Sequence, residues 1–352
     1  MATNSKIEWT KSTWSPVVGC TKCSPGCLNC YAERMAGRLA NMGQIKYMSV
    51  VSQKAGTGTI KYNKRAKYLP KWNGQIFCNK SALEIPLKRK NPTTYFVPSM
   101  GDLFHPGVPF EFIDKVMAVI ALCPQHTFQV LTKRPERMLE YINWQSIEPD
   151  IIGRYNRGQK IDASGHRGSH ICGFTNRQWP LKNLWLGTTV CNQKEADEKI
   201  PILLQIPAAK RFLSIEPMLG WVELWKSNRL KTHNFLKQNG LVEKETLCGA
   251  FGEQSQVSIT IKTGKLDWVI VAAESGPGAR FCPIENIRSV VEQGKEAGVP
   301  VFVKQIHLPK KSTKTISRPH TGSIDTDCEA WGFRVSKNMA EWPEDLRIQE
   351  MP

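Results

Sequence analysis

Residues 13–36 read TWSPVVGCTKCSPGCLNCYAERMA, so that a β-branched stretch, a cysteine-rich loop and a helix-like stretch follow one another without a break. The loop holds Cys20, Cys23, Cys27 and Cys30, and the other cysteines of the chain are dispersed singly. In a reducing compartment, clustered cysteines hold a metal more often than they form disulfides. The stretch therefore predicts a strand, a thiolate-rich binding loop and a helix in series.

The segment 13–36 opens an alternation of strand-like and helix-like segments along the chain. The strand candidates are 13–19, 94–100, 127–133, 184–190, 211–217, 267–275 and 299–306. The helix candidates are 30–42, 109–123, 135–145, 195–206 and 284–298. Such alternation predicts an α/β fold with a parallel sheet wound by right-handed crossovers.

Polar side chains at the ends of these strands favour a partial (β/α) barrel over an open sheet. They are Ser99, Asp102, Thr132, Lys133, Arg134, Thr188, Thr189, Glu216, Glu274, Ser275 and Lys304. In a barrel the carboxyl ends of the strands converge on one mouth, whereas an open sheet uses only its switch point. We therefore expect a partial barrel of about six to seven mostly parallel strands.

The whole chain, 1–352, is predicted to form one barrel domain with basic insertions. Long stretches without this rhythm mark insertions at about 43–93, 146–180 and 222–266 and a C-terminal extension at about 307–352. The first apolar residues are interspersed with lysine and glutamate, unlike a signal peptide, and no apolar run is long enough for a bilayer. A cytoplasmic protein without a membrane partner is expected.

The formal net charge of +17 favours a polyanionic partner. Residues 61–72, KYNKRAKYLPKW, interleave basic and aromatic side chains, a composition suited to phosphate contact and base stacking. The candidate nucleic-acid-binding residues are Lys61, Lys64, Arg65 and Lys67. A solvated surface is the alternative for any single basic run. The predicted partner is DNA, RNA or a nucleotide.

The cysteine spacing C-x2-C-x3-C-x2-C favours a cubane iron–sulfur cluster over zinc. Zinc ribbons separate their two cysteine pairs by roughly a dozen or more residues, and so few residues between Cys23 and Cys27 make a tetrahedral site cramped. Iron–sulfur clusters need thiolates only a few ångströms apart. With four cysteine ligands every iron would be closed, whereas three ligands would leave one iron open.

The spacing C-x3-C-x2-C of Cys23, Cys27 and Cys30 resembles the signature of radical S-adenosylmethionine enzymes. This resemblance implies a [4Fe–4S] cluster whose open iron binds S-adenosylmethionine, which is cleaved to a 5′-deoxyadenosyl radical. It also implies a partial (β/α) barrel with the cluster loop after the first strand, and an electron donor protein.

A closer resemblance links the chain to a phage- and prophage-associated family that is radical-SAM-like and has no settled function. The blocks that carry it are 7–36, 97–109, 127–138, 211–220, 269–280 and 299–305. The three-cysteine motif of that family matches Cys20, Cys27 and Cys30. The third cluster ligand is therefore Cys20 by this resemblance or Cys23 by the standard spacing.

Further site residues follow from the strand ends and from the radical SAM resemblance. The resemblance implies that Ser99 and Asp102 bind the methionine amine; Asp102 could instead cap a turn. Radical SAM enzymes place the aromatic residue that contacts adenine just before the last cysteine, whereas here Tyr31 follows Cys30 and is the candidate cofactor contact. Thr188 and Thr189 suit ribose hydroxyls or a purely structural role. The candidate catalytic residues are Lys133, Glu216 and Glu274, with Arg280 at the mouth and His105 as a further acid or base.

These observations predict a radical S-adenosylmethionine enzyme that modifies or repairs nucleic acid or a nucleotide. The alternative is a non-catalytic nucleic-acid-binding protein whose cysteines hold a structural zinc ion or a closed iron–sulfur cluster.

Overall fold

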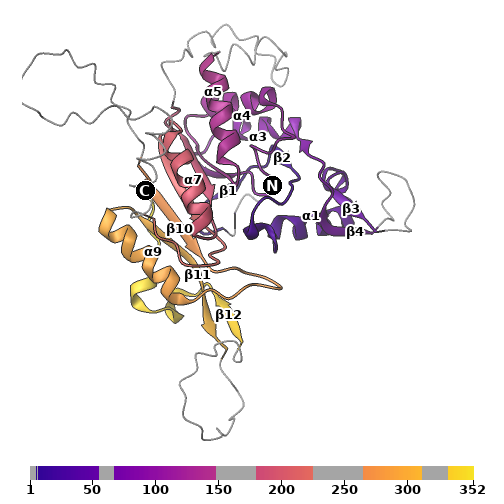
Figure 1. Cartoon of the computed structure of the whole chain (residues 1–352). Helices are drawn as coiled ribbons and strands as arrows, with labels where there is room; N and C mark the ends of the chain where they lie inside the picture. The colour runs from indigo at the N-terminus through magenta and orange to yellow at the C-terminus, as the bar shows by residue number, and fades with distance from the viewer. Residues whose placement is uncertain (1–4, 6, 55–66, 148–179, 225–264, 311–331) are drawn as a thin grey trace, which may run out of the picture.

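The computed structural model describes residues 5, 7–54, 67–147, 180–224, 265–310 and 332–352. An 8-stranded sheet, ordered β1-β6-β7-β8-β9-β10-β11-β12, curls into a half-barrel (Figure 1). All its neighbouring strands are parallel except β11 and β12. The strands are β1 Ser12–Thr13, β6 Thr94–Val97, β7 Thr127–Thr132, β8 Leu184–Thr189, β9 Lys210–Ile215, β10 Trp268–Ala272, β11 Val301–Pro309 and β12 Phe333–Ser336. The predicted α/β fold with a mostly parallel, curled sheet is confirmed.

Helices cover the outer face of this sheet (Figure 1). They are α4 Phe110–Leu122, α5 Pro135–Ile147, α7 Gln193–Gln205 and α9 Ile284–Ala297. Because side chains alternate along a strand, Leu213 and Ile215 of β9 join the core beneath the helices, and Phe212 faces the inside of the half-barrel. The two faces of each strand therefore contribute to two different apolar clusters.

Aromatic rings fill the lower part of the half-barrel. Trp9, Phe96, Phe212, Trp268 and Phe302 form one buried cluster, in which the Trp9 and Phe96 rings meet edge to face at 4.8 Å. Gly187 of β8 makes room for this packing, since a Cβ there would lie 2.6 Å from the Phe212 ring. This aromatic cluster fills the half-barrel on the side away from the carboxyl ends of the strands.

The predicted first strand, 13–19, is divided into two. β1 joins the main sheet, whereas β2, Val17–Val18, pairs antiparallel with β5, Phe77–Cys78, in a separate two-stranded sheet. Pro16 lies between them and has no N–H to continue a ladder. Its carbonyl instead accepts a hydrogen bond from the Asn79 amide at 2.7 Å. The prediction of a single strand here is wrong.

Part of the predicted insertion 43–93 forms a small lobe with the helix that follows the cysteines. The lobe contains α1 Tyr31–Asn41, α2 Ile45–Met48, β3 Val51–Gln53 and β4 Tyr68–Trp72; η2 Lys80–Ala82 and α3 Glu84–Lys88 follow. Buried Glu33 of α1 accepts a hydrogen bond from the Trp72 amide at 2.9 Å. This part of the insertion therefore packs against the helix that follows the cysteine loop.

The C-terminal extension returns to the sheet through β12, η5 Met339–Glu341 and η6 Glu344–Leu346. Trp342 and Leu346 are buried in the main core there. Most of the other two predicted insertions, 146–180 and 222–266, lies outside the described residues, which omit 148–179 and 225–264. Within the described ranges, no helix combines the length and apolar character needed to cross a membrane.

Candidate functional site

A cavity of about 300 Å³ opens at the carboxyl ends of the strands, beneath the cysteine loop. All four clustered cysteines, Cys20, Cys23, Cys27 and Cys30, line it. The other predicted site residues that line it are Tyr31, Ser99, Asp102, Lys133, Thr189, Glu216 and Glu274. Residues far apart in the sequence thus meet around one space, as the convergence of strand ends predicted.

Some predicted site residues lie elsewhere. Thr188 does not line the cavity: its Oγ1 donates to the Thr132 carbonyl at 3.1 Å, because it points to the opposite face of β8 from Thr189. Lys67 is exposed at the start of β4. Lys61, Lys64 and Arg65 lie outside the described residues.

The cysteine loop connects β2 to α1 and is partly ordered by its own short helix, η1, Pro25–Cys27. The Ser24 hydroxyl caps it by accepting the Gly26 amide at 3.1 Å. Cys27 is buried, Cys23 is exposed, and Cys20 and Cys30 are intermediate. In the described part of the chain, no three His, Cys, Asp or Glu side chains are grouped closely enough to hold a metal ion. The four thiols therefore share a cavity without forming a preassembled ligand cage.

Charge inside the cavity favours a thiolate at Cys27. A hydrogen bond from Cys23 lowers the pKa of the Cys27 thiol, the Lys133 ammonium acts in the same direction, and burial opposes both. The same hydrogen bond raises the pKa of Cys23. Burial would lower the pKa of Lys133, but the nearby thiols outweigh it and raise that pKa. Lys133 forms no salt bridge with a described carboxylate, so its charge faces the sulfurs.

Arg134 holds the first part of the cysteine loop. Its guanidinium donates to the Asp102 carboxylate at 2.7 Å and to the Thr21 carbonyl at 2.8 Å, and it lies 3.6 Å from the Cys20 sulfur. Asp102 is itself buried. The ion pair therefore connects the ends of β6 and β7 to the loop.

Glu274 holds the second part of the loop from the other side of the cavity. Its carboxylate accepts two hydrogen bonds from the Arg280 guanidinium, at 2.7 and 2.8 Å, and one from Asn29 at 3.1 Å. Arg280 also donates to the Pro25 carbonyl at 3.0 Å. Burial alone would raise the pKa of Glu274, but the hydrogen bonds from Arg280 and Asn29 outweigh it and lower that pKa.

Glu216 and Lys304 form an ion pair at the mouth of the cavity that was not predicted from the sequence. Glu216 accepts from the Lys304 ammonium at 2.5 Å rather than pairing with Lys133. Tyr31 donates its hydroxyl to the Ser99 carbonyl at 2.6 Å, which leaves its ring at the cavity rim. Lys133 is thus the described lysine of the cavity whose charge remains available to an anionic ligand.

The cavity is also lined by Trp9, Asn29 and Ser214, which were not among the predicted site residues. Ser214 could have been found from alternation along RFLSIEP, because it shares a face with Glu216. Trp9 precedes the first strand, where no periodic signal indicated the cavity.

His105 and His307 are both buried and neutral. The Gly107 amide donates to Nδ1 of His105, so Nε2 carries the proton and donates to the Thr21 hydroxyl at 2.9 Å. Nδ1 of His307 likewise accepts from the Cys282 amide, and its Nε2 donates to the Glu274 carbonyl at 2.8 Å. Burial lowers the pKa of each imidazole. His105 therefore contacts the cysteine loop at Thr21, and His307 connects Cys282 to the backbone of Glu274.

We expect the protein to lose stability as the pH falls below about 6.5, the ordinary histidine value. The unfolded chain then binds protons that folded His105 and His307 resist, so acid favours unfolding. Urea midpoints between pH 7.5 and 5.0 measure this loss. His307→Gln, which can accept from Cys282 and donate to Glu274, should reduce the pH dependence. An unchanged pH dependence in that variant would exclude His307 as a contributor.

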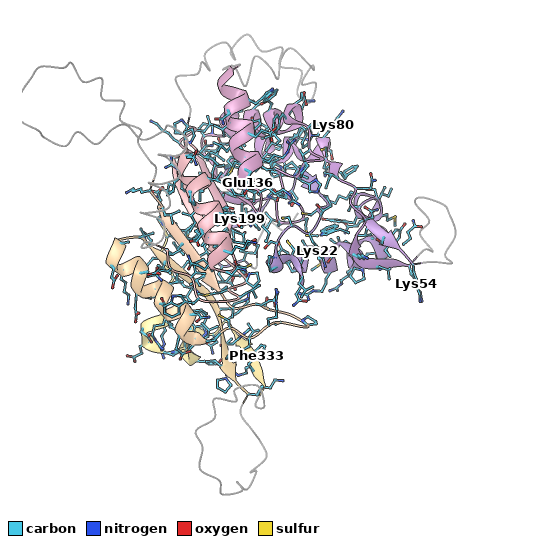
Figure 2. The ribbon with its side chains drawn as sticks, in the orientation of Figure 1. Lys22, Lys54, Lys80, Glu136, Lys199 and Phe333 are labelled. Atoms are coloured by element: carbon cyan, nitrogen blue, oxygen red, sulfur yellow. The ribbon has the colours of Figure 1, made fainter. Side chains whose placement is uncertain are left out.

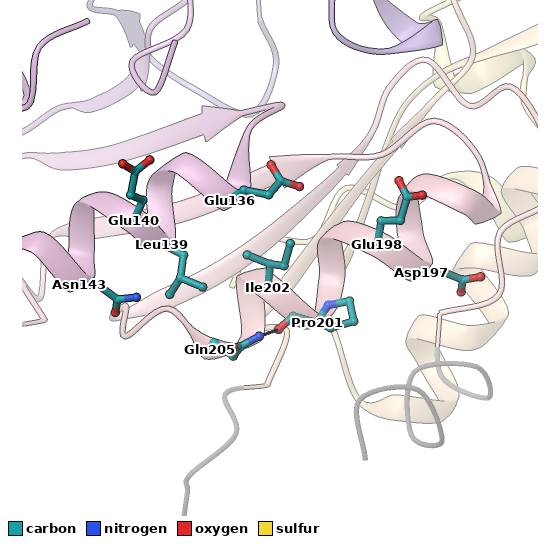
Figure 3. Close-up of a pocket in the computed structure, with 9 residues that line it drawn as sticks. All are labelled: Glu136, Leu139, Glu140, Asn143, Asp197, Glu198, Pro201, Ile202 and Gln205. Atoms are coloured by element: carbon teal, nitrogen blue, oxygen red, sulfur yellow. Dashed lines mark hydrogen bonds between the residues drawn. The ribbon is translucent and has the colours of Figure 1, made fainter. Parts of the chain in front are cut away.

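A second hollow, of about 810 Å³, lies between α5 and α7 on the helical layer (Figure 3). Glu136, Glu140, Asp197 and Glu198 surround an apolar floor that includes Leu139 and Ile202. No cysteine lines this groove. Its acidic rim would repel phosphates, so it does not suit the polyanionic partner expected from the net charge.

Comparison with known proteins identifies the family of the chain but assigns it no activity. Residues 4–331 match the model of a family described as "Protein of unknown function (DUF5131)". No curated protein and no solved structure matches the chain.

Proposed function

The chain belongs to the DUF5131 family, and we propose that it is a radical S-adenosylmethionine enzyme with one [4Fe–4S] cluster that acts on nucleic acid or a nucleotide. One observation carries the proposal: Cys20, Cys23, Cys27 and Cys30 line the same cavity as the polar strand ends of a curled, mostly parallel sheet. This arrangement supports the proposal because thiols and polar side chains surround one space.

The donor set of the cavity fits an iron–sulfur cluster chemically. Thiolates are the protein ligands of such clusters, and the lowered pKa of Cys27 favours that form. Cys27 and Cys30 would be two ligands, and Cys20 or Cys23 would be the third. When bound, the cluster supplies an electron that cleaves S-adenosylmethionine to a 5′-deoxyadenosyl radical, and an electron donor protein would resupply it.

The chain's own residues would orient the reactants and shape the charge of the site. Lys133 offsets the negative charge of the thiolates and can attract a carboxylate or a phosphate. Arg134 and the Glu274–Arg280 pair fix the two parts of the cysteine loop. The buried aromatic cluster that contains Trp9 and Phe96 would form the apolar end of the substrate space.

A non-catalytic nucleic-acid-binding protein is the second candidate function. It is favoured by the presence of all four cysteines at one cavity, since four ligands would form a structural zinc site or a closed cluster. The ligand count separates the two functions, because only three cysteine ligands leave an iron open.

Anaerobic purification tests the proposal. The protein should be brown and, after reduction with dithionite, should convert S-adenosylmethionine to 5′-deoxyadenosine, detected by chromatography. Colourless protein with stoichiometric zinc would reject the enzyme in favour of the binding protein. Brown protein that cannot cleave S-adenosylmethionine would indicate a closed cluster.

We expect nucleic-acid binding to depend on the basic segment around β4. Lys54 and Lys67 are joined by a backbone hydrogen bond of 2.8 Å and flank residues 55–66; Figure 2 labels Lys54. Neutralising Lys61, Lys64, Arg65 and Lys67 together should reduce the log–log salt dependence of DNA or RNA affinity by roughly three units, since each phosphate contact contributes about 0.7–0.9.

Fluorescence anisotropy across a salt series measures this slope. The matched control neutralises Lys210, at the start of β9, and Lys295, near the end of α9. Both lie toward the amino ends of the parallel strands, whereas the cavity lies at their carboxyl ends. The control should leave the slope unchanged. Equal slopes for the basic-segment variant and the wild type would place the binding surface elsewhere.

A further inference from the structure

Two buried hydroxyls face the cavity without hydrogen-bond partners. Thr189 of β8 and Ser214 of β9 are neighbours in the parallel register, and both line the cavity. Their exposed fractions are only 2% and 3%. Among the described residues, neither side-chain oxygen makes a hydrogen bond, although the backbone carbonyls of both residues do. Because both residues line the cavity, a ligand bound there can hydrogen-bond with the two hydroxyls.

An aromatic floor lies in the same cavity. Trp9 and Phe96 line it together with Leu131, and Phe212 and Trp268 pack below them. The Trp9 indole N–H is buried and has no hydrogen-bond partner in the described structure. The floor thus offers flat apolar contact beside two hydroxyls that can each donate or accept.

This hydroxyl and aromatic region lies below the cysteines and the charged mouth. Ser214 lies in β9, whereas Glu216 follows the end of that strand and pairs with Lys304 at the mouth. The hydroxyls therefore lie deeper along the strands than this ion pair, by two residues or roughly 7 Å of extended chain. A group bound at the cysteine loop can leave this lower space to a second ligand.

We propose that this deeper region is a nucleobase-binding subsite that holds a base of the substrate. The base lies on Trp9, Phe96 and Leu131, and its polar edge hydrogen-bonds with Thr189 and Ser214. A planar ring with donors and acceptors on its edge can lie on the aromatic floor and hydrogen-bond with both hydroxyls, whereas a phosphate suits the charged mouth, where Lys133 lines the cavity. The proposal rests on the proposed function, in that the substrate is nucleic acid or a nucleotide.

Binding of nucleosides to the purified full chain tests the subsite without requiring catalysis. The probes are adenosine, guanosine, cytidine, uridine and thymidine, compared with free ribose and inorganic phosphate, in titration calorimetry. At least one nucleoside should bind more tightly than ribose and phosphate. Thr189→Val and Ser214→Ala should each weaken its binding about three- to tenfold, the effect of one lost hydrogen bond.

Stability provides a second measurement. Because the two hydroxyls are unpaired in the free protein, Thr189→Val and Ser214→Ala should unfold at the same urea concentration as the wild type or a higher one. Ser289→Ala is the matched control: this buried hydroxyl of α9 accepts from Gln293 at 3.1 Å, outside the cavity. It should lower stability and leave nucleoside affinity unchanged.

Several outcomes would overturn the subsite. The first is a nucleoside affinity no higher than that of ribose, and the second is an unchanged nucleoside affinity in both cavity variants. The third is full displacement of the nucleoside by S-adenosylhomocysteine, which would assign the region to the adenosine of the cofactor. Failure of the proposed function would give a different result. If the wild type holds no iron but binds a nucleoside, and both variants weaken that binding, then the radical mechanism is wrong and the subsite stands. Cleavage of S-adenosylmethionine without nucleoside binding would reject only the subsite.

Discussion

Cys27→Ala and Cys30→Ala should each yield protein without bound iron and without S-adenosylmethionine cleavage, whereas the wild type should hold about four iron atoms per chain. Cys27 ends the short helix η1, and Cys30 is the N-cap of α1, so the two-residue spacer places both thiols at one turn of the loop. Both line the cavity. Colorimetric iron analysis of anaerobically reconstituted protein measures the loss.

The third ligand is decided by the same measurement on Cys20→Ala and Cys23→Ala, of which one should abolish iron binding. Cys20 is partly buried with the Arg134 guanidinium 3.6 Å from its sulfur, whereas Cys23 is exposed and hydrogen-bonds with Cys27. The matched control is Cys78→Ala, a partly buried thiol of β5 that does not line the cavity and should retain full iron content. Loss of iron in all four variants would leave no open iron, and the radical mechanism would be wrong.

The order of strands and helices was predictable from the sequence because each segment carries its own periodic signal. The predicted helix 109–123 corresponds to α4, Phe110–Leu122, and the predicted strand 127–133 to β7, Thr127–Thr132. The first strand was not predictable in the same way. Two residues on either side of Pro16 are too short for periodicity, and their partners, β6 and β5, are distant in the sequence.

The candidate site was predictable as a set of residues but not as a set of contacts. Strand ends identified Lys133, Glu216 and Glu274, because parallel strands bring their carboxyl ends to one edge. Which charges pair depends on geometry between distant segments: Asn29 and Glu274 are separated by 245 positions, and Lys304 and Glu216 by 88. Nothing local in the sequence distinguishes these pairs from their alternatives.

One-residue alternation explains the remaining differences. Thr188 and Thr189 look equivalent in LWLGTTV, yet only Thr189 faces the cavity, since adjacent side chains on a strand point to opposite faces. The sequence alone could distinguish Thr188 from Thr189 only if another residue were already known to face the inside of the half-barrel. On β9 that reference is Phe212, whose ring faces the inside: Ser214 shares its face by alternation, and Thr189 is paired with Ser214 in the register.

Asp102→Ala should lower the free energy of unfolding by about 3–5 kcal/mol, the usual cost of removing one partner from a buried ion pair. One carboxylate oxygen accepts from the Phe104 amide at 3.0 Å and from the Thr132 hydroxyl at 2.7 Å, and the other accepts from Arg134 at 2.7 Å. The variant leaves the Arg134 guanidinium, only 11% exposed, without a counter-ion. Urea denaturation followed by circular dichroism measures the loss.

The same carboxylate was the candidate acceptor for the methionine amine of S-adenosylmethionine, and the two roles predict different results. Asp102→Asn should cost about 1–3 kcal/mol, because the amide keeps one acceptor but loses the charge that Arg134 requires. Ser99→Ala is the control: this residue lines the same cavity, its hydroxyl shares one hydrogen bond with Ser15 at 3.1 Å, and its loss should cost about 1 kcal/mol or less. If Asp102→Ala instead unfolds at the wild-type urea concentration but no longer binds S-adenosylmethionine, then Asp102 is a cofactor ligand and Arg134 alone secures the loop.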